Sequence, residues 1–588
     1  MSVTRNIRSA VIEALQELYQ QQFSEKDFQV NQTKPEFEGD YTVVLFSLVK
    51  QLKKSPDAIG NELGGKLKSG NPGLIVDFNL IKGFLNLTIS NEFWANFLNT
   101  INPGFGTQPS SGRRMMVEYS SPNTNKPLHL GHLRNNFLGW SVAAISKANG
   151  NEIMKTCIVN DRGIHICKSM IAWQMFANGA TPESTGIKGD HFVGDYYVKF
   201  NDQYKKEILE LTTKGMKAEE AEKEAPIMKA AQQMLIDWEA GKTEVMELWE
   251  KMNSWVYEGF DQTYKRIGSD FQKIYYESQT YLLGKQYVEA GLAKGIFFKK
   301  DDGSVWIDLT AEGFDQKLLQ RRDGTSVYMT QDLGLADVKQ AEFHADQSVY
   351  VIGDEQNYHM QVLKIICQKL GIPKADGIYH LSYGMVELPT GKMKSREGTV
   401  VDADDLLDEM YAIAARHTQE LGKVKDFAED ELHDLYNTIS LGALKFFLLR
   451  VDPKKRMIFN PEESIDFHGF TGPFVQYTHA RIRSILRKEQ PQLTKYSGTF
   501  LKLEKELIIA LEQFPSVVQQ AGDEMNPSVI AVYVFNLAKT FNSFYTEHSI
   551  MNAETPEKKE LRLQIAQLTA NVIKTGMNLL GIRVPERM

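Results

Sequence analysis

A strand, a helix and a second strand follow one another between residues 113 and 160, and this order constrains the fold more than any other feature. "MMVEY" reads as a strand, residues 130–148 as a helix that ends at "NG", and "EIMKTCIVND" as a strand again. "QSVYVIGDEQ" before a helix at 357–370 repeats the step from strand to helix. Strands joined through helices pair in parallel, so the sequence predicts an open α/β sheet of the Rossmann type.

Three predicted parts surround or contain this sheet. Residues 1–108 read as a small α+β domain, with a Pro/Gly/Ser-rich linker at its end. Residues 109–425 hold the parallel sheet and a charged helical insertion at about 199–265. After that the strand patterns stop, and amphipathic helical patterns predict an α-helical bundle over 426–588.

Composition limits the class of protein. The 588 residues are 42% hydrophobic and 24% charged, and the apolar runs are too short for a membrane span. Three cysteines, Cys157, Cys167 and Cys367, predict a reducing compartment, and their spacing fits no zinc site. We therefore expect a cytoplasmic protein without a membrane partner or a dedicated metal site. The net charge of -8 neither indicates nor excludes nucleic-acid binding, which depends on local patches.

A near match to a phosphate-binding loop is interpreted as a helix. "GNELGGKL", Gly60 to Leu67, approaches the pattern G-x-x-x-x-G-K-[ST]. Leu67 replaces the hydroxyl residue that would hold magnesium, and no strand precedes the run. We expect the end of a helix here rather than a nucleotide site.

Two histidines stand where the helix after the first strand begins. "SSPNTNKPLHLGHLRNN" places His129 and His132 around Gly131. The first turn of a helix presents free N–H groups and a positive dipole end, which favour phosphate. Gly131 lets a flat group such as adenine approach the backbone. Two surface histidines beside a helix cap are the alternative, which the strand–loop–helix setting disfavours.

A basic, glycine-flanked run supplies a second candidate site. "YGMVELPTGKMKSREGTVV" begins as a strand and then places Lys392, Lys394 and Arg396 between Gly391 and Gly398. A mobile basic loop of this kind can close over a polyphosphate and stabilise developing charge. Alone, it would be read as an ordinary basic surface loop.

Together these stretches resemble a class I aminoacyl-tRNA synthetase. "HLGH" is similar to the HIGH motif of that class, and "KMKSR" to its KMSKS motif. The runs "HFVGDYY", "TSVYMTQDLG", "YVIGDEQNYH", "GPFVQYTHARIRSIL" and "LLGIRVPERM" resemble the arginyl-tRNA synthetases in particular. The matches run in the family's order from Val117 to the C-terminus.

The resemblance implies a two-step reaction. The carboxylate of L-arginine attacks the α-phosphate of ATP and releases pyrophosphate, and the adenylate then acylates the terminal ribose of tRNA(Arg). Magnesium is expected on the ATP phosphates. The implied catalytic residues are His129, His132, Lys392 and Lys126. The implied ATP-binding residues are His129, Gly131, His132, Gly384, Met385, Lys392, Lys394 and Arg396.

The resemblance also implies residues that bind arginine. Glu118, Tyr328 and Asp332 are expected at the guanidinium, whose planar donors suit bidentate acceptance by carboxylates. Asn123 and Gln356 are expected at the α-amino group. Asp332 lies one helical turn after Tyr328, so a simple helix contact is the alternative for it.

One departure from the family pattern leaves a role open. Ser395 stands where the KMSKS motif has its second lysine. In many arginyl members that lack this lysine, a lysine just before the HIGH motif is thought to replace it, and Lys126 has that place. Which of Lys126, Lys394 and Arg396 contacts phosphate stays open. The family generally needs bound tRNA to activate arginine, and we expect the same here.

For tRNA, the resemblance assigns roles to the first and last domains. Residues 1–108 are expected to contact the D-loop, with Phe84 stacking and Asn86 reading a base edge, against an ordinary core phenylalanine as the alternative. Residues 426–588 are expected to bind the anticodon, with Tyr477, His479 and Arg481 in the contact. Residues 109–425 are then the catalytic domain.

Two other functions remain as alternatives. The first is a related adenylate-forming ligase such as the cysteine enzymes, which the absence of zinc ligands and the presence of Glu118 and Asp332 disfavour. The second is a tRNA-binding relative without activity, which should lack the histidines or the basic loop. The expected partners are tRNA(Arg), L-arginine and ATP, and the family implies a monomer.

Overall fold

A five-stranded parallel sheet forms the centre of the molecule. The computed structural model describes residues 3–588 apart from 35, 103, 326, 390–400, 421–425, 493–495 and 497. The strand order is β12 (Ile378–Tyr383), β11 (Gln347–Gly353), β5 (Arg114–Glu118), β6 (Glu152–Val159) and β7 (Lys273–Tyr276), and every pairing is parallel. The predicted fold class is confirmed.

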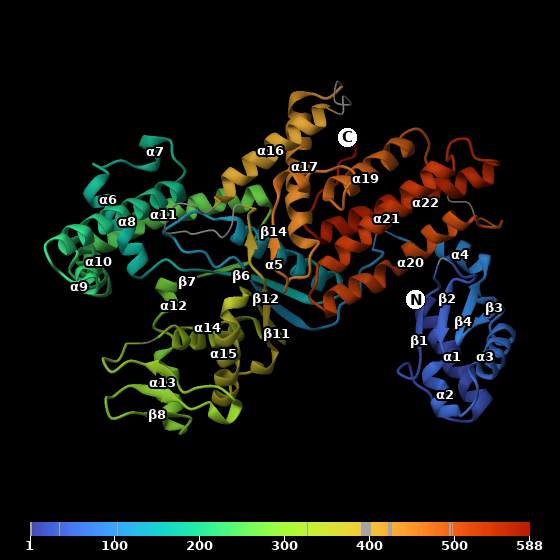
Figure 1. The fold of residues 1–588 in the computed structure, drawn as a ribbon, viewed down its shortest axis with the longest axis horizontal. Helices are drawn as coiled ribbons and strands as arrows, with labels where there is room; N and C mark the ends of the chain where they lie inside the picture. Colours follow the sequence, from blue (N-terminus) through green and yellow to red (C-terminus); the bar gives the residue numbers. More distant parts are fainter. Residues whose placement is uncertain are drawn as a thin grey trace.

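Helices cover both faces of this sheet (Figure 1). Val117 and Val349 share a core with α5 (Leu130–Ala148). Met116 and Tyr350 belong to a second core with residues of α14 (Tyr328–Phe343) and α15 (Asn357–Leu370). Successive strand residues point to opposite faces, and both faces are covered, which is why the run "MMV" of β5 is apolar. β5 lies at the centre of the sheet, where ligands of such folds bind at the carboxyl edge.

The N-terminal unit is an antiparallel sheet covered by helices. The strand order is β1-β2-β4-β3. Its elements are α1 (Val3–Tyr19), β1 (Gln29–Gln32), β2 (Tyr41–Val44), α2 (Phe46–Leu52), α3 (Pro56–Gly70), β3 (Ile75–Ile81), β4 (Phe84–Ile89) and α4 (Asn91–Leu98). "GNELGGKL" lies inside α3, where a Cβ on Gly64 would come within 2.4 Å of the Phe78 ring. Gly60 and Gly64 therefore serve close helix–sheet packing, and the helical interpretation is confirmed.

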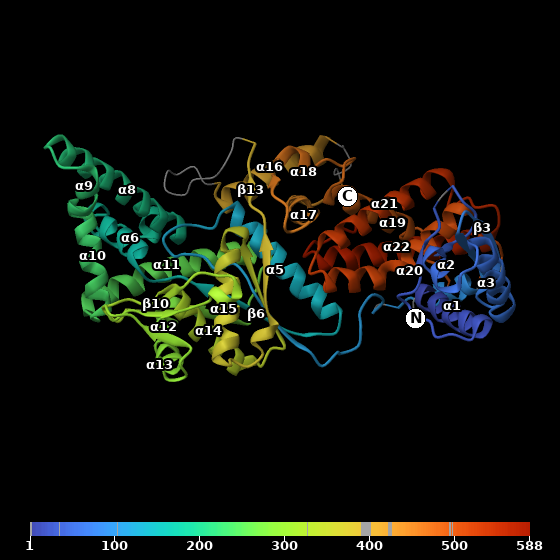
Figure 2. The ribbon, with the colours of Figure 1, turned by 60° about the horizontal axis from the view of Figure 1, so that its bottom comes forward.

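Helices also form a long projection at one end of the molecule (Figure 2). They are α6 (Ile164–Phe176), α7 (Pro182–Thr185), α8 (Gly189–Thr213), α9 (Ala218–Glu224), α10 (Pro226–Glu239) and α11 (Thr243–Ile267). The helical region starts well before residue 199, because the charged run marks where α8 becomes exposed and not where it begins.

A small antiparallel sheet that the sequence analysis did not anticipate follows β7. It has the order β10-β9-β8 and packs beside two helices. Its strands are β8 (Phe297–Lys299), β9 (Val305–Ile307) and β10 (Lys317–Gln320), and the helices α12 (Glu277–Thr280) and α13 (Lys285–Ala293) come before them in the chain.

The C-terminal part is helical, apart from the short β14 (Met457–Ile458), which pairs with β13 (Val386–Glu387). Its helices are α16 (Ala403–Glu420), α17 (Glu429–Leu449), α18 (Pro461–Ser464), α19 (Gly472–Leu486), α20 (Lys502–Asp523), α21 (Ser528–Glu547) and α22 (Pro556–Leu579). Among the described residues, no helix combines the length and the apolar character needed to span a bilayer.

The N-terminal unit docks on this bundle and not on the central sheet. The buried Glu512 of α20 accepts hydrogen bonds from the Tyr41 hydroxyl (3.0 Å) and from the Val3 backbone N–H (2.6 Å). Lys505 forms an ion pair with Asp40 (2.8 Å). The unit therefore lies at the opposite end from the helical projection (Figure 1).

One buried arginine fixes the central sheet to the C-terminal part. Arg134 of α5 is 1% exposed. Its guanidinium donates to four backbone carbonyls, those of Gly384 (2.6 Å), Met385 (3.3 Å), Pro453 (3.2 Å) and Lys455 (2.8 Å). Burial lowers the pKa of Arg134 to about 10, so it remains charged at neutral pH.

Replacing Arg134 with methionine should destabilise the fold. Four backbone carbonyls, two of them in the buried residues Gly384 and Pro453, would lose a charged donor, at a cost of about 3–5 kcal/mol in the free energy of unfolding. Urea unfolding followed by circular dichroism measures this. Arg416→Met is the matched control, because Arg416 pairs with Glu462 on the surface and its loss should leave the free energy of unfolding almost unchanged. Equal effects of the two variants would contradict the role given to Arg134.

Candidate active site

The two histidines close the first turn of α5 on each other. His129 is the N-cap, and its Nδ1 accepts from the Gly131 N–H (3.1 Å). His132 Nδ1 accepts from the His129 N–H (3.1 Å), and the ring centres lie 3.9 Å apart. Because each Nδ1 is an acceptor, each proton is on Nε2. Both rings therefore offer an Nε2–H donor at the positive end of a helix dipole.

Both imidazoles are held in the neutral form. Burial, together with the nearby charge of Lys126, lowers the pKa of His129 to about 3. Burial also lowers the pKa of His132 well below its usual value, with further effects of His129 and Lys126. Burial lowers the pKa of Lys126 as well. The first turn of α5 is thus preorganised to donate hydrogen bonds, with one lysine beside it as the source of positive charge.

The loop between β5 and α5 has a strained backbone. Ser120 and Ser121 have positive φ angles of 82° and 47°, which L residues other than glycine rarely adopt. Asn135 accepts from the Ser120 N–H (2.6 Å) and donates to the Val351 carbonyl (2.7 Å). Asn136 donates to the Ser120 hydroxyl (3.0 Å). These two asparagines, which the sequence analysis did not single out, hold the turn that leads to Asn123.

Glu118, the last residue of β5, is buried against α14. Its Oε2 forms an ion pair with Lys339 and lies 3.5 Å from the Thr156 hydroxyl. Within the described residues, these contacts leave Oε1 without a partner. One oxygen of the Glu118 carboxylate is thus engaged by Lys339 and Thr156, and the other can accept a further hydrogen bond.

Tyr328 and Asp332 lie on the first turns of α14. Tyr328 is 75% exposed, and Asp332 accepts a hydrogen bond from His359 Nε2 (2.7 Å). Gln356 is exposed in the turn before α15. Asn123 and Tyr328 line one cleft, while Asp332 and Gln356 lie outside its lining.

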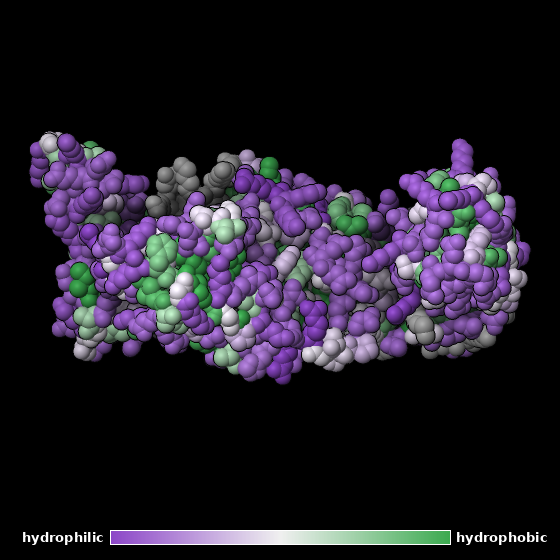
Figure 3. Space-filling view, turned by 90° about the horizontal axis from the view of Figure 1, so that it is seen from below, coloured by the Kyte–Doolittle hydropathy of each residue, from purple (hydrophilic) through white to green (hydrophobic). Residues whose placement is uncertain are grey.

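That cleft has a volume of about 770 Å³ and lies between the helical projection and α14. It contains Glu277, just after β7, whose pKa is raised to about 7, mainly by burial. Within the described residues no hydrogen bond or ion pair engages the Glu277 carboxylate. Arg162, just after β6, lines the same cleft and stacks on Tyr281 at 3.8 Å. Apolar surface gathers over the region of α12 to α15 (Figure 3), and Leu282 at the cleft is 64% exposed.

The position of Glu277 directly after a strand could have marked it as a site residue from the sequence. Polar residues directly after parallel strands meet at one edge of the sheet. Glu118 ends β5, Asp161 follows β6, and Glu277 follows β7. Asp161 accepts from the Ser278 N–H (2.8 Å) and hydroxyl (2.7 Å), so it fixes the turn that carries Glu277.

Lys392, Lys394 and Arg396, with Ser395 and both flanking glycines, lie outside the described residues. The chain on either side of them is attached to α5. Gly384 and Met385 accept from Arg134, and Met385 is 40% exposed. On the far side, the Leu130 N–H donates to the Val401 carbonyl (3.1 Å).

Of the residues expected to contact RNA, some are exposed and others are buried. Phe84 is 41% exposed and packs edge-to-face on the exposed Phe46 at 5.3 Å. Asn86 is buried, donates to Asn79 (2.9 Å) and accepts from Thr42 (2.7 Å). Its amide is therefore satisfied inside the sheet, and the expectation that it reads a base edge does not fit this arrangement.

At the C-terminal end, Tyr477 and Arg481 line a groove of about 800 Å³ together with Tyr545. The Arg481 guanidinium lies 4.9 Å from the Tyr477 ring centre and donates to Asn542 (2.6 Å). His479 is buried and hydrogen-bonds the Pro585 carbonyl (2.9 Å), so it supports the groove and does not face it.

Three family models match consecutive parts of the chain. Residues 98–460 match the family model of the catalytic domain of tRNA synthetases class I (R). Residues 475–588 match the DALR anticodon binding domain, and residues 5–89 match the arginyl tRNA synthetase N-terminal domain.

Similar proteins cover the whole chain. The chain is 53% identical to an arginine–tRNA ligase of Bacteroides thetaiotaomicron and 52% identical to one of Flavobacterium psychrophilum, with all of each chain covered. The fold is similar to that of the arginyl-tRNA synthetase of Thermus thermophilus, with a TM-score of 0.82 and 25% identity over all of both chains.

The histidine pair should resist protonation. In the unfolded chain histidine titrates near pH 6.5, whereas His129 in the folded protein titrates near 3. The unfolded state then binds more protons between these values, so stability falls as the pH is lowered through this window. NMR of ¹⁵N-labelled imidazoles, assigned with His129→Gln and His132→Gln, should show Nε2–H tautomers unchanged from pH 8 to 5. The urea-denatured protein is the control, and a titration near 6.5 in the native protein would refute the assignment.

Proposed function

Because this chain belongs to the arginyl-tRNA synthetase family, we propose that ATP and L-arginine meet at the carboxyl edge of its central sheet. The neutral Nε2–H donors of His129 and His132 carry this proposal, since they lie in the first turn of α5, after the loop whose Asn123 lines the cleft. The arginine carboxylate attacks the α-phosphate, an O–P bond forms, and pyrophosphate leaves. The two imidazoles donate to phosphate oxygens, and Lys126 supplies positive charge.

Neutral donors suit this step. Because both histidines stay neutral, they hydrogen-bond the phosphates without holding pyrophosphate by full charges. In addition to burial, the charge of Lys126 contributes to lowering the pKa of both histidines, which supports it as the substitute for the missing lysine of the KMSKS motif. Lys392, Lys394 and Arg396 are proposed to complete the site. Magnesium would be held by the phosphates, because Asp402, whose backbone pairs with His129, and Asp404 already face His191 and Lys188.

We assign the guanidinium of the substrate to a set of acceptors from neighbouring elements. Asp332 and the Tyr328 hydroxyl come from α14, Glu118 offers Oε1, and Glu277 adds a carboxylate from the cleft. A cation entering this region would lower the pKa of Glu277 and ionise it. Asn123 and Gln356 are neutral and suit orientation of the α-amino group.

In the second step, the terminal ribose hydroxyl of tRNA attacks the adenylate carbonyl carbon, and AMP leaves. We propose that residues 426–588 bind the anticodon arm through the groove of Tyr477, Arg481 and Tyr545, where bases can stack on the aromatic rings. Phe84 with Phe46 is the proposed stacking surface of residues 1–108 for the D-loop. Residues 109–425 are the proposed catalytic domain, and a cytoplasmic monomer is the proposed form.

ATP–pyrophosphate exchange with each of the twenty amino acids, with and without total tRNA, tests the function. Arginine alone should support exchange, and only when tRNA is present. Exchange without tRNA would remove the proposed dependence on tRNA, and exchange with another amino acid would overturn the assignment of the cleft.

Asp332→Asn should reduce kcat/KM for arginine by about 100-fold, because a neutral amide cannot balance a guanidinium. ATP binding, measured by calorimetry, should be unchanged. Glu342→Gln is the matched control, since Glu342 lies at the far end of α14 and pairs with Lys273 and Tyr275. Wild-type arginine kinetics in Asp332→Asn would refute the guanidinium assignment.

A further inference from the structure

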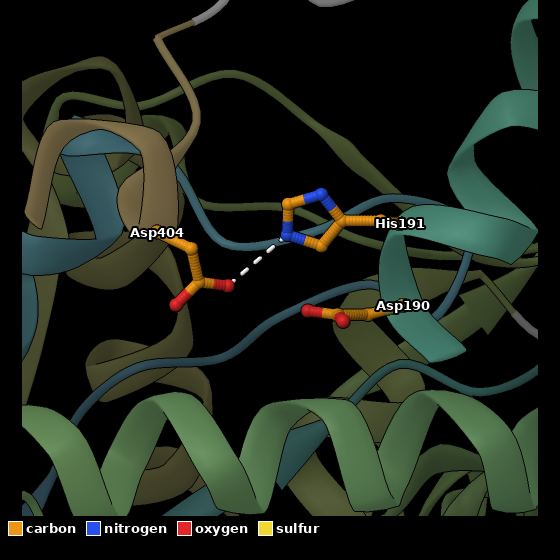
Figure 4. A group of neighbouring side chains, drawn as sticks. All are labelled: Asp190, His191 and Asp404. Atoms are coloured by element: carbon orange, nitrogen blue, oxygen red, sulfur yellow. Dashed lines mark hydrogen bonds and ion pairs between the residues drawn. The ribbon is translucent and has the colours of Figure 1, made fainter. Parts of the chain in front are cut away.

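A group of charged side chains joins the start of α8 to the start of α16, outside the substrate cleft (Figure 4). Lys188, Asp190 and His191 come from the α8 side, and Asp402 and Asp404 from the α16 side. We call these five residues the α8–α16 cluster. Asp190 is fully buried, and the remaining members are largely so.

Asp404 is the centre of the cluster. Its Oδ2 accepts from Lys188 Nζ (2.7 Å) and from His191 Nε2 (3.0 Å). Lys188 Nζ also contacts Asp190 (3.0 Å) and the Thr263 hydroxyl of α11 (2.6 Å). Two aspartates and a histidine at this spacing resemble a metal site. The ammonium between the carboxylates supplies the positive charge instead, so the cluster is a network of ion pairs.

The cluster is connected directly to the proposed phosphate site. Asp402 pairs through its backbone with His129, and the Ala403 N–H donates to the Leu128 carbonyl (2.9 Å). The Asp402 carboxylate caps α16 by accepting from the Asp404 N–H (2.8 Å). His191 Nε2 lies 3.5 Å from the same carboxylate oxygen. His191 therefore contacts both acids of the segment that lies against the histidine cap of α5.

The charge of His191 decides the balance of this network. The groups that face it are Asp402 and Asp404 of the α16 side, and Asp190, Lys188 and Asp195 of the α8 side. The hydrogen bond to Asp404 raises the pKa of His191 above its usual value. Burial alone would raise the pKa of Asp404, but hydrogen bonds from His191 and Lys188 lower it to about 2. With a neutral imidazole, the three acids of the α8–α16 cluster would face one lysine beside the phosphate site.

We propose that His191, as an imidazolium, is a positioning residue for arginine activation that holds residues 401–404 against the turn carrying His129. This inference rests on the function proposed above. His191 touches no substrate and acts through Asp402 and Asp404. Because its folded pKa is raised, the clamp is complete at low pH and weakens as the pH rises through that value.

Exchange kinetics in the presence of arginine and tRNA test the proposal. In His191→Gln, kcat should fall by about 10- to 100-fold, the usual effect of slight misplacement, with KM for ATP and arginine within about twofold. The wild-type decrease of kcat toward alkaline pH should be absent. His191→Lys keeps a cation and should recover most of kcat without the alkaline decrease. The control is His468→Gln, at an exposed histidine. Wild-type kcat and pH profile in His191→Gln would overturn the proposal.

Hydrogen–deuterium exchange gives a second test that needs no activity. His191→Gln should speed exchange in peptides that contain the Leu130 and Ala403 amides, with peptides of β11 unchanged. Equal exchange in all peptides would overturn the proposal even if kcat falls, and faster exchange throughout would mean a general loss of stability, which also overturns it. Failure of the wild-type protein to exchange pyrophosphate with arginine would instead refute the proposed function.

Discussion

The arrangement of the active site depends on one buried guanidinium. Arg134 binds four carbonyls from two chain segments that are about seventy residues apart, and it does so from the helix that carries the histidine pair. A buried charge of this kind is tolerated only where its donors are satisfied, so the segments have little freedom to shift relative to α5. Arg134 thereby fixes the position of α5, and of His129 at its start, relative to these two segments.

Other side chains of α5 attach the helix to further parts of the molecule. Asn135 and Asn136 hold the strained turn at Ser120, and Ser141 donates to the Leu579 carbonyl of the C-terminal bundle (2.7 Å). The helix thus contacts the sheet, the loop before it and the bundle at once. This helix offers a physical route by which RNA bound to the bundle could affect the histidines, as the proposed dependence of arginine activation on tRNA requires.

The sequence predicted much of the fold, because periodicity is a local property. The parallel sheet, the helix that begins at the two histidines, the α+β character of residues 1–108 and the C-terminal bundle were all visible as sequence patterns. The three-stranded sheet after β7 was not, because strands of three or four residues leave too short a pattern. Burial was also out of reach: Asn86 and His479 look like surface residues in sequence, yet long-range packing places both inside. The roles of Glu277 and Asn135 depend on neighbours that are distant in the chain, so the sequence did not reveal them. For Glu277, its place at the end of a parallel strand was a usable signal.

The docking of the N-terminal unit on Glu512 sets an order of events during synthesis. The unit has its own sheet with helices packed on it and ends near Leu98, so its internal packing can form early. Its partner on α20 is made more than four hundred residues later, roughly 20–80 s at usual rates of translation. During that interval the surface around Tyr41 and Asp40 has no bundle to cover it. The N-terminal unit can therefore dock only after the central sheet and its helices have been synthesised. The C-terminal helices then bring the two ends of the chain together.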